Sequence, residues 1–116
     1  MNVILLKSKI HAATVTEANL NYEGSLTLDR VLMKAANLLP GERVQVLNLN
    51  NGSRIETYII ESEKDSGTVC LNGPAARNGV AGDKIHILSY GVYTQEEAAG
   101  HRPKVVHLDD NNRIRT

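Results

Sequence analysis

Hydrophobic residues recur at every second position along much of the chain, a spacing typical of strands that bury one face. From Val3 to Val15 this alternation predicts a strand with two different faces. One face carries Lys7, Lys9 and His11, and the other carries Ser8, Ile10 and Ala12. Further strands are expected in "VQVLNLN", "RIETYII", "TVCLNG", "KIHILSYGVY" and "KVVHL". The dipeptide Asn51-Gly52 joins the first two of these, which is a strong β-hairpin signal.

Two segments depart from this alternation and predict short helices. The first has helical spacing at Leu28, Val31, Leu32, Ala35, Ala36 and Leu39, with Thr27 as its cap and Asp29 in its first turn. The second is "TQEEAA", in which Thr94 and Glu97 have the spacing of a capping box. "PAARNGVAGD" is expected to be a turn or a short helical connection, and "DDNNRIRT" a frayed tail.

Many short strands and few helices predict a mainly β chain, a small β-barrel forming one domain over residues 1–116. Phe and Trp are absent, so the core must be aliphatic and association into an oligomer is expected. Thirteen basic and thirteen acidic side chains cancel, which argues against nucleic acid as a partner. The single cysteine, Cys70, excludes an intrachain disulfide and a cysteine-based zinc site. Without a long apolar run or a leader pattern, the expected location is the cytoplasm, away from membranes.

The segment "YEGS", Tyr22 to Ser25, is not explained by the helix that follows it, because Thr27 already serves as the expected cap. A Gly-Ser dipeptide is most often a flexible turn. It also permits a second chemistry, in which the serine hydroxyl attacks the carbonyl of the preceding residue. Glycine at that position allows the strained backbone that such an attack requires. Cleavage by this route converts the serine into a pyruvoyl ketone.

Several segments together resemble pyruvoyl-dependent aspartate 1-decarboxylases over nearly the whole chain. They are "KSKIHAATVTEANLNYEGS", "NNGSRIETYII", "CLNG", "GDKI" and "EEAAGHRPKV". The resemblance implies self-cleavage between Gly24 and Ser25 into residues 1–24 and 25–116. It implies a pyruvoyl cofactor made from Ser25, with no metal and no pyridoxal phosphate. This group forms a Schiff base with L-aspartate and releases CO₂ and β-alanine for pantothenate and coenzyme A synthesis.

The resemblance also assigns roles to individual residues. Tyr58 is the implied proton donor, and the Thr57 hydroxyl stabilises the oxyanion during cleavage, with His11 and Tyr22 near the processing site. The implied substrate-binding residues are Lys9, Arg54, Thr57, Asn72, Gly73, Pro74 and Ala75. The planar guanidinium of Arg54 is suited to bind a carboxylate with two hydrogen bonds. The implied assembly is a homotetramer of six-stranded double-psi β-barrels with sites between subunits, and a need for a maturation factor is left open.

Three details do not follow the family pattern simply. On a regular strand Arg54, Glu56 and Tyr58 share a face and Thr57 points the other way, so we expect a bulge there or a site between subunits. Pro74 stands where the family more often has alanine, and it has no N–H to donate to the substrate. His86 stands where the family is usually apolar; it is either an ordinary strand histidine or, if it borders the pocket, a group that shifts the pH optimum.

Taken one by one, the candidate residues have simpler interpretations as solvated charges, strand packing or turns. Two other functions are therefore possible for these residues. A swapped-hairpin DNA-binding regulator would use the "VLNLNNGSRIETY" hairpin, but it requires clustered positive charge that a neutral chain lacks. An inert β-barrel scaffold would contain "EGS" only as a loop.

Overall fold

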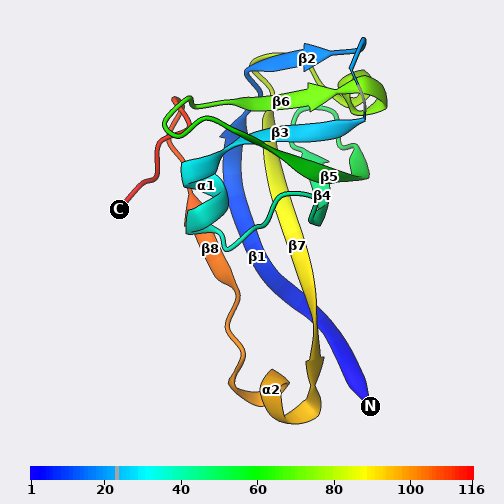
Figure 1. Cartoon of the computed structure of the whole chain (residues 1–116), viewed down its shortest axis with the longest axis vertical. Helices are drawn as coiled ribbons and strands as arrows, with labels where there is room; N and C mark the ends of the chain where they lie inside the picture. Colours follow the sequence, from blue (N-terminus) through cyan, green and yellow to red (C-terminus); the bar gives the residue numbers. More distant parts are fainter. Residues whose placement is uncertain (23) are drawn as a thin grey trace.

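The computed structural model describes residues 1–22 and 24–116 of the chain (Figure 1). Glu23, within the "YEGS" segment, lies outside the described residues. The elements follow in the order β1 (Asn2–Thr14), β2 (Glu17–Asn19), β3 (Ser25–Asp29), α1 (Arg30–Ala35), β4 (Arg43–Asn48), β5 (Arg54–Ser62), β6 (Val69–Asn72), the 3₁₀ helix η1 (Gly73–Asn78), β7 (Lys84–Thr94), α2 (Gln95–Gly100) and β8 (Lys104–His107).

The strands form one mixed sheet in the order β2-β6-β3-β5-β4-β7-β1-β8. The pairs β1/β8, β2/β6 and β3/β5 are parallel, and the remaining pairs are antiparallel. Figure 1 shows the long strands β1 and β7 side by side, with β2, β6 and β3 stacked across one end. The predicted mainly β class is confirmed. Eight strands are found in the described part of the chain, and no pairing there joins β2 to β8, so the sheet is not closed there and the six-stranded barrel stays a prediction.

The core is aliphatic, as the absence of Phe and Trp required. Its largest fully buried side chains are Ile10, Leu26, Leu28, Leu32, Ile59, Leu71, Ile85, Ile87, Val15, Val44 and Val69. Each such side chain stabilises the fold by about 1.5–3 kcal/mol relative to an exposed position. These residues come both from the long strands β1 and β7 and from strands β3 and β6 across one end. One core therefore joins the two parts of the sheet.

In β1 the register against β7 first shifts between Leu6 and Ser8, and the predicted alternation holds from Lys7 to His11. Ser8 and Ile10 are buried, and Lys7, Lys9 and His11 are partly exposed, as expected. The register against β7 then shifts between Ile10 and Ala13, and Ala12 has a φ of 63°. This irregularity moves Ala13 instead of Ala12 into the core, so the expectation that Ala12 shares the buried face is wrong.

The first predicted helix is shorter and begins later than expected. Residues Ser25–Asp29 form β3, which pairs with both β5 and β6, so their backbone groups are committed to the sheet. Asp29, not Thr27, caps α1 by accepting a 2.8 Å hydrogen bond from the N–H of Val31. The same carboxylate accepts bonds from the N–H groups of Asp65 and Gly67. The helical spacing predicted from Leu28 onward is therefore wrong at its start, where Leu28 belongs to a strand.

Two local signals are confirmed. The Asn51-Gly52 turn joins β4 to β5 in an antiparallel hairpin, with Gly52 at a φ of 77°. At the start of α2, the Thr94 side chain accepts from the N–H of Glu97 at 3.1 Å. The Glu97 carboxylate accepts from the N–H of Thr94 at 2.8 Å, completing the capping box.

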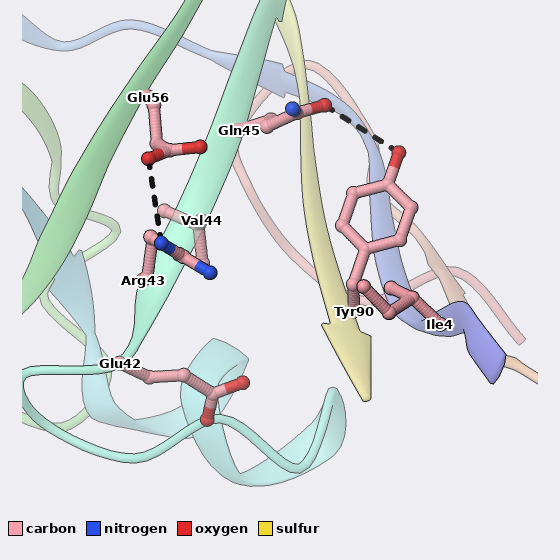
Figure 2. Close-up of a pocket in the computed structure, with 7 residues that line it drawn as sticks. All are labelled: Ile4, Glu42, Arg43, Val44, Gln45, Glu56 and Tyr90. Atoms are coloured by element: carbon pink, nitrogen blue, oxygen red, sulfur yellow. Dashed lines mark hydrogen bonds and ion pairs between the residues drawn. The ribbon is translucent and has the colours of Figure 1, made fainter. Parts of the chain in front are cut away.

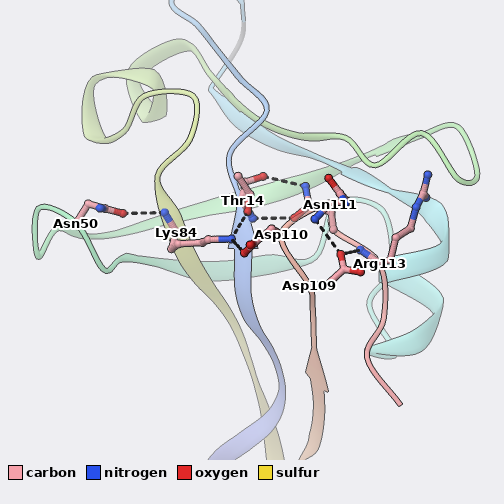
Figure 3. Close-up of polar contacts among 8 residues, drawn as sticks. Thr14, Asn50, Lys84, Asp109, Asp110, Asn111 and Arg113 are labelled. Atoms are coloured by element: carbon pink, nitrogen blue, oxygen red, sulfur yellow. Dashed lines mark hydrogen bonds and ion pairs between the residues drawn. The ribbon is translucent and has the colours of Figure 1, made fainter.

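The expected frayed tail is instead held against the body of the protein. Asn112 is only 2% exposed. Its side chain accepts from the N–H of Thr14 at 2.7 Å and donates to the carbonyls of Thr14 and Gly67. Around it, the Asp109 carboxylate accepts from the N–H groups of Asn111 and Arg113 (Figure 3). The prediction failed because polar residues that usually mark a loose end here satisfy backbone groups of other segments.

Candidate functional site

Ser25 begins β3 and is completely buried. It lies opposite Asn72 of β6 in the antiparallel register. The Asn72 amide donates to Ser25 Oγ at 2.9 Å and to Thr27 Oγ1 at 2.7 Å. The expected nucleophile is therefore held by a side chain that the resemblance assigned only to substrate binding.

A hollow of about 410 Å³ lies beside this position, and we call it the Gly24 pocket. It is lined by Gly24, Ile55, Glu56, Thr57, Tyr58, Pro74, Ala75 and Asn78. Five of these were predicted site residues, contributed by the segment before β3, by β5 and by η1. Gly73, at a φ of 59°, makes the turn that starts η1 and brings the next two residues to the pocket.

Thr57 and Tyr58 both line the pocket although they point to opposite faces of β5. The expected bulge is wrong, because β5 pairs with β4 without a register shift from Arg43↔Tyr58 to Leu47↔Arg54. The pairing of β3 with β5 begins only at Leu26↔Ile59. The first half of β5 therefore extends past β3, and the pocket lies at this edge, where side chains of both faces are within reach.

Glycine at position 24 suits a close approach to Pro74. A Cβ atom added there would lie 3.2 Å from Pro74 Cδ, closer than most Cβ contacts allow. Pro74 is the second residue of η1, in the first turn, where its missing N–H is not needed. The Gly24–Ser25 bond thus lies between the proline ring and the start of a buried strand.

Lys9, His11, Tyr22 and Arg54 are not among the residues that line the Gly24 pocket. The Arg54 guanidinium donates to Gln45 Oε1 at 2.7 Å on the exposed face of β5. Tyr22 is 51% exposed. Within one chain, the structure therefore brings together the processing bond, Thr57 and Tyr58, but not the predicted cationic substrate ligands.

His11 belongs to a cluster of three histidines from β1, β7 and β8. Its ring stacks on His86 with centroids 4.2 Å apart and lies 5.0 Å from the ring of His107. Burial, reinforced by the charges of Lys9 and His11, lowers the pKa of His86 to about 4. Burial also lowers the pKa of His11, together with the charges of Lys9, His107 and Arg115. His86 is not among the Gly24 pocket residues, and its Nδ1 accepts a 3.0 Å hydrogen bond from the N–H of Ala12.

The low pKa of His86 predicts a loss of stability in mild acid. The unfolded chain takes up this proton near pH 6.5 and the folded chain only near pH 4, so the contribution is complete above pH 6.5 and is lost as the pH falls to about 4. We expect this one group to lower the free energy of unfolding by about 1–3 kcal/mol over that range. Denaturant unfolding of the unchanged chain and of His86→Ile at pH 7, 5.5 and 4 measures this change in the free energy of unfolding.

In His86→Ile this part of the pH dependence should disappear. The matched control is His101→Gln, at the end of α2, which should retain it. If the free energy of unfolding of His86→Ile depends on pH as it does in the unchanged chain, the proton uptake occurs at another residue.

A second hollow of about 430 Å³ lies on the exposed side of β4 (Figure 2). It is lined by Ile4, Glu42, Arg43, Val44, Gln45, Glu56 and Tyr90. Burial would raise the pKa of Glu42, but hydrogen bonds from Lys7 and Ser89 outweigh it and the pKa is lowered. Neither residue of the Gly-Ser bond lines this hollow, so the Gly24 pocket is the better candidate although it is slightly smaller.

No group of three or more His, Cys, Asp or Glu side chains in the described part of the chain is arranged to hold a metal ion. No helix among the described residues has the length and apolar character needed to cross a membrane.

Comparison with known proteins adds a family to this geometry. The model of the aspartate decarboxylase family matches residues 1–115. The aspartate 1-decarboxylase of Caldicellulosiruptor saccharolyticus is 59% identical over 114 residues, covering 98% of this chain and 89% of that protein. That of Thermoanaerobacter pseudethanolicus is 55% identical over 113 residues, covering 97% of each chain. That of Listeria monocytogenes is 56% identical over 110 residues, covering 95% of this chain and 87% of that protein.

These matches, together with the site, define a carboxy-lyase, an enzyme that removes CO₂ from its substrate. The chain belongs to the aspartate decarboxylase family. Membership over nearly the full length argues against both the DNA-binding regulator and the inert scaffold.

Proposed function

We propose that this chain cuts its own backbone between Gly24 and Ser25 and then decarboxylates L-aspartate to β-alanine, the step that supplies pantothenate and coenzyme A synthesis. The observation that carries the proposal is the position of the Gly-Ser bond. Ser25 is buried and hydrogen-bonded at the start of β3, and the residue before it lines a pocket shared with Thr57 and Tyr58. Membership of the aspartate decarboxylase family supports the same reaction.

In the proposed cleavage, Ser25 Oγ attacks the carbonyl carbon of Gly24, and the acyl group moves from nitrogen to oxygen to give an ester. β-Elimination releases Gly24 as a carboxylate and leaves dehydroalanine at position 25. Hydrolysis then releases ammonia and leaves a pyruvoyl group. The Thr57 hydroxyl is the proposed donor to the oxyanion formed on Gly24, since both residues line one pocket.

A pyruvoyl carbonyl at position 25 supplies the electron sink that loss of CO₂ requires. The residues present fit such a group, because Gly24, which precedes its precursor Ser25, lines a hollow of about 410 Å³. Tyr58 lines that hollow and is 40% exposed, so we assign to it the proton that replaces CO₂ on the substrate carbon. Backbone N–H groups of Gly73 or Ala75 would bind the substrate, because Pro74 has none.

We further propose that the site is completed by another subunit of a homotetramer. L-Aspartate carries two carboxylates, yet the residues that line the Gly24 pocket include Glu56 and no Lys or Arg. Lys9 and Arg54 of a neighbouring subunit would supply the missing positive charge. The proposal also includes a six-stranded double-psi barrel, a homotetrameric state and a cytoplasmic location. A maturation factor is needed only if the purified chain does not cut itself.

Arg54→Ala should weaken aspartate binding without slowing cleavage. Loss of a charge-assisted, two-point contact with a carboxylate should raise KM about 10- to 100-fold, equivalent to about 1.5–3 kcal/mol. Steady-state assays of CO₂ release measure KM, and intact mass measures cleavage. Arg54→Lys keeps the charge but not the planar fork and should give an intermediate KM. An unchanged KM in Arg54→Ala would remove Arg54 from the substrate site.

Intact mass after incubation tests the function as a whole. The proposal requires two fragments, residues 1–24 and 25–116, of which the second begins with a group that hydrazine or borohydride modifies. A chain that stays whole, with no reactive ketone under any maturation condition, would refute it. Salt-sensitive DNA binding by the whole chain would instead favour the regulator. A chain that neither cuts itself nor binds DNA would favour the scaffold.

A further inference from the structure

The strands around Ser25 gather four polar side chains on one face. In the antiparallel pairing of β3 with β6, Ser25 lies opposite Asn72 and Thr27 lies opposite Cys70. Residues two apart in a strand share a face, and so do residues directly opposite each other in paired strands. All four side chains therefore point to the same side of β3 and β6. Cys70 and Asn72 are 6% and 3% exposed, so their polar atoms must be satisfied by protein neighbours.

The hydrogen bonds of Asn72 define which way its amide points. Its nitrogen donates to both hydroxyl oxygens, Ser25 Oγ at 2.9 Å and Thr27 Oγ1 at 2.7 Å. Its Oδ1 accepts from Cys70 Sγ at 3.1 Å. Other acceptors near the thiol, Glu17 Oε2 and the Leu71 carbonyl, are farther away at 4.0 and 3.9 Å. The amide therefore has a partner for each of its polar ends.

The Cys70 thiol matters because it disfavours the flipped orientation of the Asn72 side-chain amide. If the amide rotated by 180°, its nitrogen would face a sulfur, which is a weak acceptor, and Oδ1 would face the two hydroxyls. Ser25 would then donate its proton to an amide oxygen, a group too weakly basic to remove it. In the observed orientation Ser25 Oγ accepts from Asn72, so the Ser25 proton is directed to another group.

The protonation state of Cys70 is consistent with a donor. Burial raises the pKa of its thiol, and the nearby Glu17 carboxylate raises it further, so the S–H is retained at neutral pH. A thiolate at this position could not donate to Asn72 Oδ1.

We infer that Cys70 is a positioning residue for self-cleavage: its S–H holds Asn72 Oδ1, so that the Asn72 amide nitrogen is presented to Ser25 Oγ. This inference rests on the proposed function, since it concerns the reactivity of Ser25 in cutting the bond to Gly24. Cys70 itself does not touch the reacting bond and acts only through Asn72.

The test compares variants at position 70 that differ in their ability to donate. Cys70→Val removes the donor and adds about one methyl group, Cys70→Ala removes it without added bulk, and Cys70→Ser restores a donor. The rate at which the 25–116 fragment appears is followed by intact mass, and thermal unfolding of the uncut chain checks the fold. The loss of one hydrogen bond predicts cleavage about 3- to 10-fold slower in the Val and Ala variants, and a rate near that of the unchanged chain in Cys70→Ser.

A double-mutant cycle separates this role from simple packing. In an Asn72→Ala background, Cys70→Val should cause no further slowing, because there is no amide left to orient. Equal rates for Cys70→Val, Cys70→Ser and the unchanged chain would overturn the inference, as would a slowing by Cys70→Val that persists in full without Asn72. If the unchanged chain is itself never cut, the proposed function fails first and the positioning role fails with it. Cleavage that is normal in every Cys70 variant refutes the positioning role alone.

Discussion

Ser25→Ala should leave the chain whole and without decarboxylase activity. The substitution removes the oxygen that attacks Gly24 and, with it, the only source of the pyruvoyl group in the proposed reaction. Activity should fall to background, a loss of at least about 10⁶-fold on the scale of enzyme rate enhancements. Intact mass and CO₂ release from L-aspartate measure the two effects on the same sample.

The fold should survive this change, so the result reports on chemistry. Alanine removes one buried hydroxyl and leaves the Asn72 amide with Thr27 as a partner, a loss of about 1 kcal/mol. Ser8→Ala is the matched control, because Ser8 is also a buried serine in a strand but lies in β1. It should be cut and remain active. A Ser25→Ala chain that still breaks at the same bond, or still releases CO₂, would contradict the proposed mechanism.

Tyr58→Phe should separate the two reactions. The ring still packs at the edge of β5, so cleavage should continue, but the phenol proton assigned to the substrate carbon is gone. Loss of a general acid usually slows turnover by about 10²- to 10⁴-fold, and we expect kcat to fall within that range. The measurement is kcat on protein that intact mass shows to be fully cut.

Tyr90→Phe provides the control. Tyr90 is 42% exposed, close to the 40% of Tyr58, but it lines the second hollow and bonds Gln45 Oε1 at 3.4 Å (Figure 2). Its kcat should not change. If Tyr58→Phe keeps full kcat, or if it blocks cleavage, Tyr58 has a different role from the one assigned here.

Features encoded by a few adjacent residues could be predicted from the sequence. The Asn51-Gly52 hairpin and the Thr94–Glu97 capping box are of this kind, because each depends on hydrogen bonds within one turn. The start of α1 could not be predicted in this way. Leu26 and Leu28 fit a strand and Leu28 also fits the helix, and only pairing with β5 and β6 decides between them.

The same distinction applies to the site. Gly24, Thr57, Tyr58, Pro74 and Ala75 were expected together, and they do line one pocket. The contacts of Asn72 with Ser25 and Thr27 depend on strand register across more than 40 residues of sequence, so no local pattern reveals them. The hydrogen bond from the N–H of Thr14 to Asn112 Oδ1 could not be predicted either, since it joins the two ends of the chain.

The position of the Gly-Ser bond within the sheet has a consequence for the product of cleavage. All strands before the bond, β1 and β2, pair only with strands after it, namely β7, β8 and β6, among the described residues. Lys84 of the second segment also bonds Thr14 of the first through Nζ and Oγ1, at 2.6 Å (Figure 3). The two fragments would therefore stay interleaved as a noncovalent heterodimer, in which the short piece is a permanent structural subunit and not a discarded propeptide.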